Sequence, residues 1–272
     1  MNRESFYAEM DGGKNLDYEI YLNTAELFAC QKPFNEFCNK DELQFQVVHQ
    51  VEALWMKLIA YTLLDIDEYM EQQQAFRILK LFERCNRTMR LMIDQLDLLE
   101  TMSPKEYQEI RLQLGNGSGR ESPGFRVLLK IIPNIWRTFE TVYLKGRART
   151  VEQIYDSSYV HDDVYAIAEA MLDFDEQLQK FRQHHILLIQ RSIGMGAASL
   201  KGRSVDLLQA GAKNRFFPGL WDIRARQHQR SRCWRTSTEW LPSVGWPACD
   251  IDRLEYSSGR VRRIKALPAF VP

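Results

Sequence analysis

Apolar residues recur every three or four positions along most of the chain, which is the spacing of one face of an α-helix. Four stretches show this pattern clearly: residues 42–69, 74–99, 125–144 and 162–191. Pro133 lies inside the third stretch and is expected to bend its helix. Because each stretch has one apolar face to bury, the pattern predicts an all-α fold, a bundle of long helices.

Short sequence signals mark where these helices begin and end. Asn39 is followed three residues later by Glu42, which predicts a capping box before the first long helix. Ser103 with Pro104 directly after it predicts the start of another helix. The segment GNGSGRESPG is the densest turn signal in the chain, and Gly194 is expected to end the last long helix.

Two histidines fall on apolar helix faces. His49 lies four residues after Phe45, and Met56 continues the same face. His185 lies on a seam with Phe181 and Leu188. A buried imidazole is most often a core side chain with a hydrogen-bond partner. Two imidazoles inside a bundle can also frame a cofactor, with His185 as an axial haem ligand and His49 on the opposite side. The pattern alone leaves both interpretations open.

Other kinds of catalytic or metal site are disfavoured by the sequence. A carboxylate-bridged di-metal bundle needs a glutamate three residues before each histidine, but Gln46 and Arg182 occupy those positions. The chain has no G-x-S-x-G motif, and GNGSG lacks the lysine of a phosphate-binding loop. Its five cysteines form no CxxC pair, which disfavours a zinc site, and no CxxCH, which disfavours covalent haem attachment.

Composition limits the kinds of binding partner and the cellular compartment that we expect for the protein. The 272 residues carry 36 basic and 36 acidic side chains, so net charge gives no reason to expect nucleic acid or a membrane surface as a partner. No apolar run is long enough to span a membrane, and the polar N-terminus lacks the apolar core of a signal peptide. Together with the unpaired cysteines, these features predict a cytoplasmic protein.

The chain is expected to have three parts. Residues 1–15 carry little pattern and are predicted to be mobile, and residues 16–224 form the main domain, beginning with an N-terminal arm. Residues 225–272 are rich in arginine, contain Trp234, Trp240 and Trp246, and show no persistent helical or strand period. We interpret this last part as an appendage, either poorly ordered or a lid or subunit contact.

Several segments resemble the tryptophan 2,3-dioxygenase family of haem enzymes. FQVVHQVEALWMKL resembles the family text F-x-x-x-H-Q-x-x-E-L-W, and FRQHHILLIQRSIG resembles W-R-x-R-H-x-x-x-V-x-R-x-I-G. SGRESPGFR resembles S-G-F-Q-S-x-Q-F-R, while LDYEIYL and RFFPGLWDIR resemble the N-terminal arm and the end of the family core. The matches follow the family order from about residue 16 to 224.

This resemblance implies a haem pocket with non-covalently bound haem b, O₂ as a co-substrate and a homo-oligomer, either a tetramer or a dimer. It implies that His185 is the axial ligand of the haem iron and that His49 is the distal partner of the substrate ring. The remaining implied roles concern substrate binding: stacking by Phe45, pairing of Arg126 with the carboxylate, and contacts from Ser199, Tyr18 and Tyr21.

The chain also departs from the family pattern. Ser199 stands where the family has the threonine of a glycine-rich loop, and Arg120 and Glu121 replace Phe-Gln. We therefore expect a remodelled pocket and a divergent member of the family from a natural-product pathway. The expected activity is oxygen insertion into the indole ring of L-tryptophan or a modified tryptophan. Dioxygenation would give N-formylkynurenine, and monooxygenation would need an external reductant. The alternatives are a haem-dependent L-tyrosine hydroxylase of the same superfamily and a non-catalytic haem-binding protein.

Overall fold

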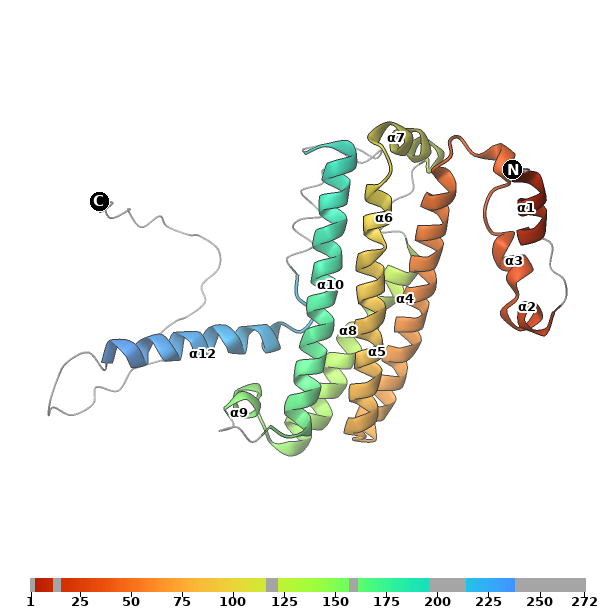
Figure 1. The fold of residues 1–272 in the computed structure, drawn as a ribbon. Coiled ribbons are helices and arrows are strands. Elements are labelled where there is room, and N and C mark those ends of the chain that lie inside the picture. Colours follow the sequence, from red (N-terminus) through yellow and green to blue (C-terminus); the bar gives the residue numbers. More distant parts are fainter. Residues whose placement is uncertain (1–2, 12–15, 116–121, 157–160, 196–213, 238–272) are drawn as a thin grey trace, which may run out of the picture. The chain divides into compact units, whose positions relative to one another are not determined.

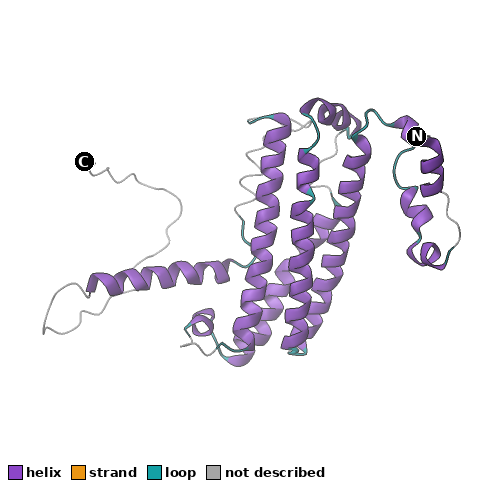
Figure 2. Ribbon diagram, viewed as in Figure 1, coloured by secondary structure: helices purple, strands orange, loops and turns teal. Residues whose placement is uncertain are grey.

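The computed structural model describes residues 3–11, 16–115, 122–156, 161–195 and 214–237. Within these residues Figure 2 shows helices joined by loops and turns, which confirms the predicted all-α fold. None of the described helices combines the length and the apolar character needed to cross a membrane.

Four long helices form the core of the protein (Figure 1). They are α4 (Glu42–Glu71), α5 (Ala75–Asp94), α8 (Pro123–Phe139) and α10 (Asp163–Ile193). The central helix α5 contacts both α4 and α10, and α8 packs against α4. Side chains such as Leu63, Phe82 and Phe174 are fully buried between them. Each such side chain contributes about 1.5–3 kcal/mol through removal of apolar surface from water.

The predicted helix over residues 74–99 is divided in the structure. Helix α5 ends at Asp94, Gln95 forms a turn, and the short helix α6 (Leu96–Glu100) follows. The next helix, α7 (Pro104–Gln113), begins as predicted. The Ser103 side chain caps it by accepting the amide of Glu106, and Pro104 occupies the first helical position, where no amide hydrogen is needed.

A change of helix type follows α8. Pro133 lies inside α8, and the chain then continues as the π-helix η3 (Glu140–Leu144) and the 3₁₀-helix η4 (Lys145–Arg147). Helix α9 (Val151–Tyr155) leads to α10, which is capped by the Asp162 side chain. Gly194 has φ +89°, a conformation that glycine adopts without strain, and ends α10 as predicted.

The N-terminal region is helical from near its start. It contains α1 (Arg3–Asp11), α2 (Asp17–Leu22), α3 (Thr24–Phe28) and the 3₁₀-helix η1 (Phe34–Glu36). Helix α1 occupies a segment whose sequence predicted little structure, because its hydrophobic pattern is weak. The mobility of residues 1–15 stays a prediction.

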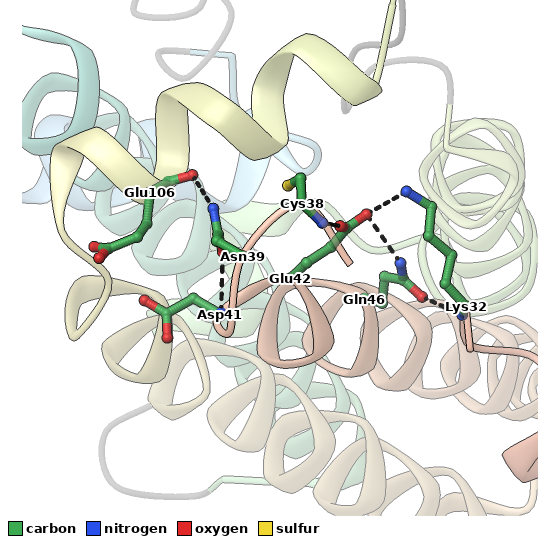
Figure 3. A network of polar contacts seen from close by, with 7 residues as sticks. All are labelled: Lys32, Cys38, Asn39, Asp41, Glu42, Gln46 and Glu106. Carbon is green, nitrogen blue, oxygen red and sulfur yellow. Dashed lines mark hydrogen bonds and ion pairs between the residues drawn. The ribbon is translucent and has the colours of Figure 1, made fainter. Parts of the chain in front are cut away.

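A polar network joins this N-terminal region to the start of α4 (Figure 3). The buried Glu42 carboxylate accepts the Cys38 amide at 2.7 Å and pairs with the Lys32 ammonium. Burial disfavours its charge, but these hydrogen bonds hold the pKa of Glu42 below its usual range.

The predicted Asn39–Glu42 capping box is wrong. Asp41 is the N-cap of α4, and the Asn39 side chain accepts the amide of Asp41 instead of capping the helix. Asn39 also donates to the Glu106 carbonyl oxygen on α7 at 3.0 Å (Figure 3). Glu42 therefore starts the helix, and its carboxylate is directed to the preceding loop.

Asp175 anchors the segment that follows residue 213. Its buried carboxylate accepts the amides of Phe216 and Phe217 at 2.9 and 3.1 Å and the indole N–H of Trp221 at 3.0 Å. Gln179 donates to the other oxygen at 3.0 Å. These four donors compensate the burial of the carboxylate on α10.

The last described helix is α12 (Pro218–Ser237). It extends beyond residue 225, where the sequence predicted no helix. The chain divides into two compact units, Met1–Gln227 and His228–Pro272. Trp240 and Trp246 lie outside the described residues, and the three-part organisation and the appendage stay predictions.

Candidate active site

His49 is held in one orientation by its own helix. Its Nδ1 atom lies 2.7 Å from the carbonyl oxygen of Phe45, one turn earlier on α4. A carbonyl oxygen only accepts hydrogen bonds, so Nδ1 carries the hydrogen and Nε2 of the neutral ring has a free lone pair. Burial lowers the pKa of His49, which favours this neutral form. The rings of Phe45 and His49 are 4.1 Å apart.

His185 is also held as a neutral imidazole. Burial lowers its pKa to about 4, and the nearby rings of His49 and His184 disfavour its protonation further. Its ring is stacked with Phe181 at 6.2 Å and 14°. Within the described part of the chain, no side chain or carbonyl group forms a hydrogen bond with the His185 ring. Because the His49 ring on α4 influences the pKa of His185 on α10, the two predicted histidines lie near each other.

Both imidazoles are partly exposed to solvent and partly desolvated by neighbouring side chains. Each keeps surface that solvent can reach, and yet each is surrounded closely enough for desolvation to lower its pKa. A neutral ring with an unshared lone pair beside Phe181 is the donor that haem iron binds. The residues present therefore fit a haem with His185 as its ligand.

The first turn of α8 is packed between the two histidine helices. A Cβ atom on Gly124 would lie 2.7 Å from Cβ of Met56 on α4, so only glycine permits this approach. The next residue, Phe125, contacts Phe181 of α10 with ring centroids 5.6 Å apart. Arg126 follows on the same turn, is exposed, and forms no ion pair with another described residue. Its backbone is thus fixed near both histidine helices.

Of the other predicted site residues, the structure places only Phe45 directly beside a histidine of the site. Tyr18 and Tyr21 lie on α2 with 72% and 88% of their surface exposed, and α2 buries no side chain. Phe45, in contrast, is buried beside His49 and also contacts the ring of Tyr107 on α7. Ser199 and the departures at Arg120 and Glu121 lie outside the described residues.

One polar cluster beside His185 was not predicted from the sequence. The His184 ring lies 3.2 Å from Glu100 and 3.3 Å from Asp97, both on α6. Arg191 lies 3.4 Å from the same Glu100. These partners are more than eighty residues apart in sequence, so no local spacing could have indicated the contact.

A helical bundle that places a neutral, apolar-lined imidazole on one long helix near a second imidazole on another has the architecture of a haem protein. The sequence profile of the family described as tryptophan 2,3-dioxygenase matches residues 6–135. Over this segment, just under half of the chain, the protein is similar to that family.

Curated relatives carry the same name. The tryptophan 2,3-dioxygenase of Myxococcus xanthus is 26% identical over 256 residues, covering 76% of this chain and 88% of the relative. Those of Serratia proteamaculans and Bacillus cereus are 26% and 27% identical, each covering 79% of this chain and 94% of the relative. The protein is accordingly a haem-dependent oxidoreductase, and haem is its cofactor.

Proposed function

We propose that the protein inserts both atoms of O₂ into the indole ring of L-tryptophan, cleaving the C2–C3 bond to form N-formylkynurenine. Both oxygen atoms enter the product, so the reaction consumes no external reductant. Support comes from the names of the relatives, and above all from the closeness of the two neutral imidazoles of His49 and His185. Bound haem supplies the iron that activates O₂, and the His185 imidazole would hold it.

His49 suits a substrate with a ring N–H. Its Nδ1 hydrogen is donated to Phe45, which leaves Nε2 as an acceptor in the neutral ring. An indole N–H is a donor only, so it complements this lone pair. A phenol hydroxyl both donates and accepts and would not need the fixed tautomer. This difference favours an indole substrate over the alternative, L-tyrosine.

Phe45 and Arg126 would bind the two ends of the amino acid. The Phe45 ring, tilted 33° to His49, offers an apolar surface for an aromatic ring. The Arg126 guanidinium has no ion pair within the described part of the chain and can grip a carboxylate with two parallel hydrogen bonds. Holding both ends fixes the indole ring for reaction, which is catalysis by orientation.

Ser199, Tyr18 and Tyr21 complete the proposed substrate site. We assign Ser199 to the substrate ammonium group. The exposed arm residues Tyr18 and Tyr21 leave a large aromatic surface without cover in one chain, which supports their insertion at a neighbouring subunit of a homo-oligomer. Free Cys30, Cys38 and Cys85 are in keeping with a cytoplasmic enzyme.

Product analysis with isotopically labelled O₂ tests the proposal. The haem-loaded protein is incubated with L-tryptophan, and the product mass shows how many labelled atoms it contains. Two atoms in N-formylkynurenine are expected. One atom, formed only with added reductant, would contradict dioxygenation in favour of a monooxygenase. Product from tyrosine or a modified tryptophan alone would contradict the substrate assignment, and inactivity towards all of them would indicate a haem-binding protein.

The His185→Ala variant tests the proposed ligand. It should lose the absorption band of histidine-ligated haem while keeping its helical circular dichroism. His228→Ala, at an exposed histidine, is the matched control and should keep the band. A His185→Ala protein with unchanged haem ligation would refute the assignment.

A further inference from the structure

Glu100 of α6 receives two contacts from one face of α10. Its Oε1 atom lies 3.2 Å from Nε2 of His184, and its Oε2 atom lies 3.4 Å from Nη1 of Arg191. His184 and Arg191 are seven residues apart, about two helical turns, so both project from the same side of α10. Asp97 adds a second acceptor for His184 at 3.3 Å. We call this set of contacts the α6 brace.

The α6 brace fixes the rotation of α10 beside the haem ligand. Successive residues of a helix project about 100° apart, so the direction of His184 determines that of His185. Between His184 and the end of α10, the described structure has no other polar side-chain contact from this helix to another helix. Apolar packing alone permits small rotations, whereas a hydrogen bond has a preferred direction.

We propose that Glu100, acting through His184, is a positioning residue that sets the orientation of the His185 imidazole towards the haem iron. The proposal rests on the proposed function of His185 as the axial ligand. Partners hydrogen-bonded directly to a ligating histidine typically change metal affinity about 10- to 100-fold when they are removed; Glu100 acts one residue away, so we expect the lower end of this range. Loss of the α6 brace should therefore weaken haem retention while leaving the fold intact, because its side chains are only partly buried.

The test uses the haem-loaded full chain and four variants. Glu100→Ala and His184→Ala remove the α6 brace, and His184→Gln restores an amide donor to Glu100. Lys180→Ala is the matched control, since it removes an ion pair with Glu176 on α10 that involves no other helix. Resonance Raman spectra of the ferrous protein give the iron–histidine stretching band, and transfer of haem to apomyoglobin gives the rate of haem loss.

We expect Glu100→Ala and His184→Ala to shift or broaden the iron–histidine band and to lose haem about tenfold faster. His184→Gln and Lys180→Ala should match the wild type. An unchanged band and rate in both alanine variants, with ligation lost in His185→Ala, would overturn the α6 brace but keep the ligand assignment. Retained ligation in His185→Ala would overturn the proposed function itself. Should Glu100→Ala fail to fold, Glu100→Gln gives the same test, because its amide can serve only one of the two donors as an acceptor.

Discussion

The Nδ1 atom of His49 lies 2.7 Å from the carbonyl oxygen of Phe45, which fixes the tautomer of the imidazole from within its own helix. We predict that His49→Ala lowers kcat/KM for L-tryptophan about 10- to 100-fold, the effect of leaving one donor without its acceptor. The same variant should change kcat/KM for 1-methyltryptophan much less, because that substrate has no ring N–H. Steady-state kinetics with the two substrates measures the difference. An equal loss for both would show that His49 does not accept the indole N–H.

Arg126 should act on the carboxylate end of the substrate. We predict that Arg126→Gln raises KM for L-tryptophan about tenfold or more, and that Arg126→Lys recovers little, because an ammonium cannot form the two parallel bonds of a guanidinium. Tryptamine lacks the carboxylate, so its binding should hardly change. Arg137→Gln, at an exposed arginine further along α8, is the control. Equal weakening of tryptophan and tryptamine binding would refute the assignment.

Glu52 makes the stability of the protein depend on pH. Burial raises the pKa of this carboxyl from its usual 4.5 to about 7, and the neighbouring Gln95 amide offsets only part of the effect. Oε1 of Glu52 and Nε2 of Gln95 are both buried without a hydrogen-bond partner in the described structure. The folded state therefore binds the proton more tightly than the unfolded state. This contribution to stability is fully present below pH 4.5 and is lost as the pH rises through 7.

We predict that Glu52→Gln raises the free energy of unfolding by about 1–3 kcal/mol at about pH 8 and changes it little at about pH 5. Urea unfolding at the two pH values measures this difference. Glu68→Gln, at an exposed carboxylate on the same helix, should have no such effect. If Glu52→Gln is destabilising at both pH values, the carboxylate has a compensating partner and the reasoning fails.

The features that followed from the sequence are those in which local spacing determines the structure. The three- and four-residue pattern predicted α4 and α10, and it placed Phe45 beside His49 because residues four apart share a helix face. The Ser103 cap was predictable for the same reason, since its partner is three residues away. Family resemblance then supplied what spacing left open, the interpretation of His49 and His185 as a pair.

The features that did not follow depend on contacts between distant segments. His184 meets Glu100 across 84 positions, and Gly124 is needed only because α4 presents Met56 at that point. The division of the helix at Gln95 could not be foreseen, because its apolar stripe continues through Leu96 and Leu99. The Asn39 cap failed because the Asn39 side chain instead accepts the Asp41 amide and donates to the Glu106 carbonyl oxygen on α7, a contact between distant segments.

Asp175 illustrates such a long-range contact and leads to a prediction of stability. Its carboxylate is fully buried and accepts hydrogen bonds from Phe216, Phe217 and Trp221, more than forty residues away. We predict that Asp175→Ala lowers the free energy of unfolding by about 3–5 kcal/mol, because several buried donors lose a charged acceptor at once. Hydrogen exchange should show faster exchange at the amides of Phe216 and Phe217 in particular.

Asp175→Asn provides a graded comparison, since its amide oxygen can still accept two of these donors while its NH₂ group opposes the others. We expect it to fall between the wild type and Asp175→Ala. The neighbouring Glu176→Gln removes only an exposed ion pair with Lys180 and should cost less than about 0.5 kcal/mol. If Asp175→Ala unfolds at the same urea concentration as Glu176→Gln, then the Phe216–Trp221 segment is held by apolar packing of Phe217 and not by the carboxylate.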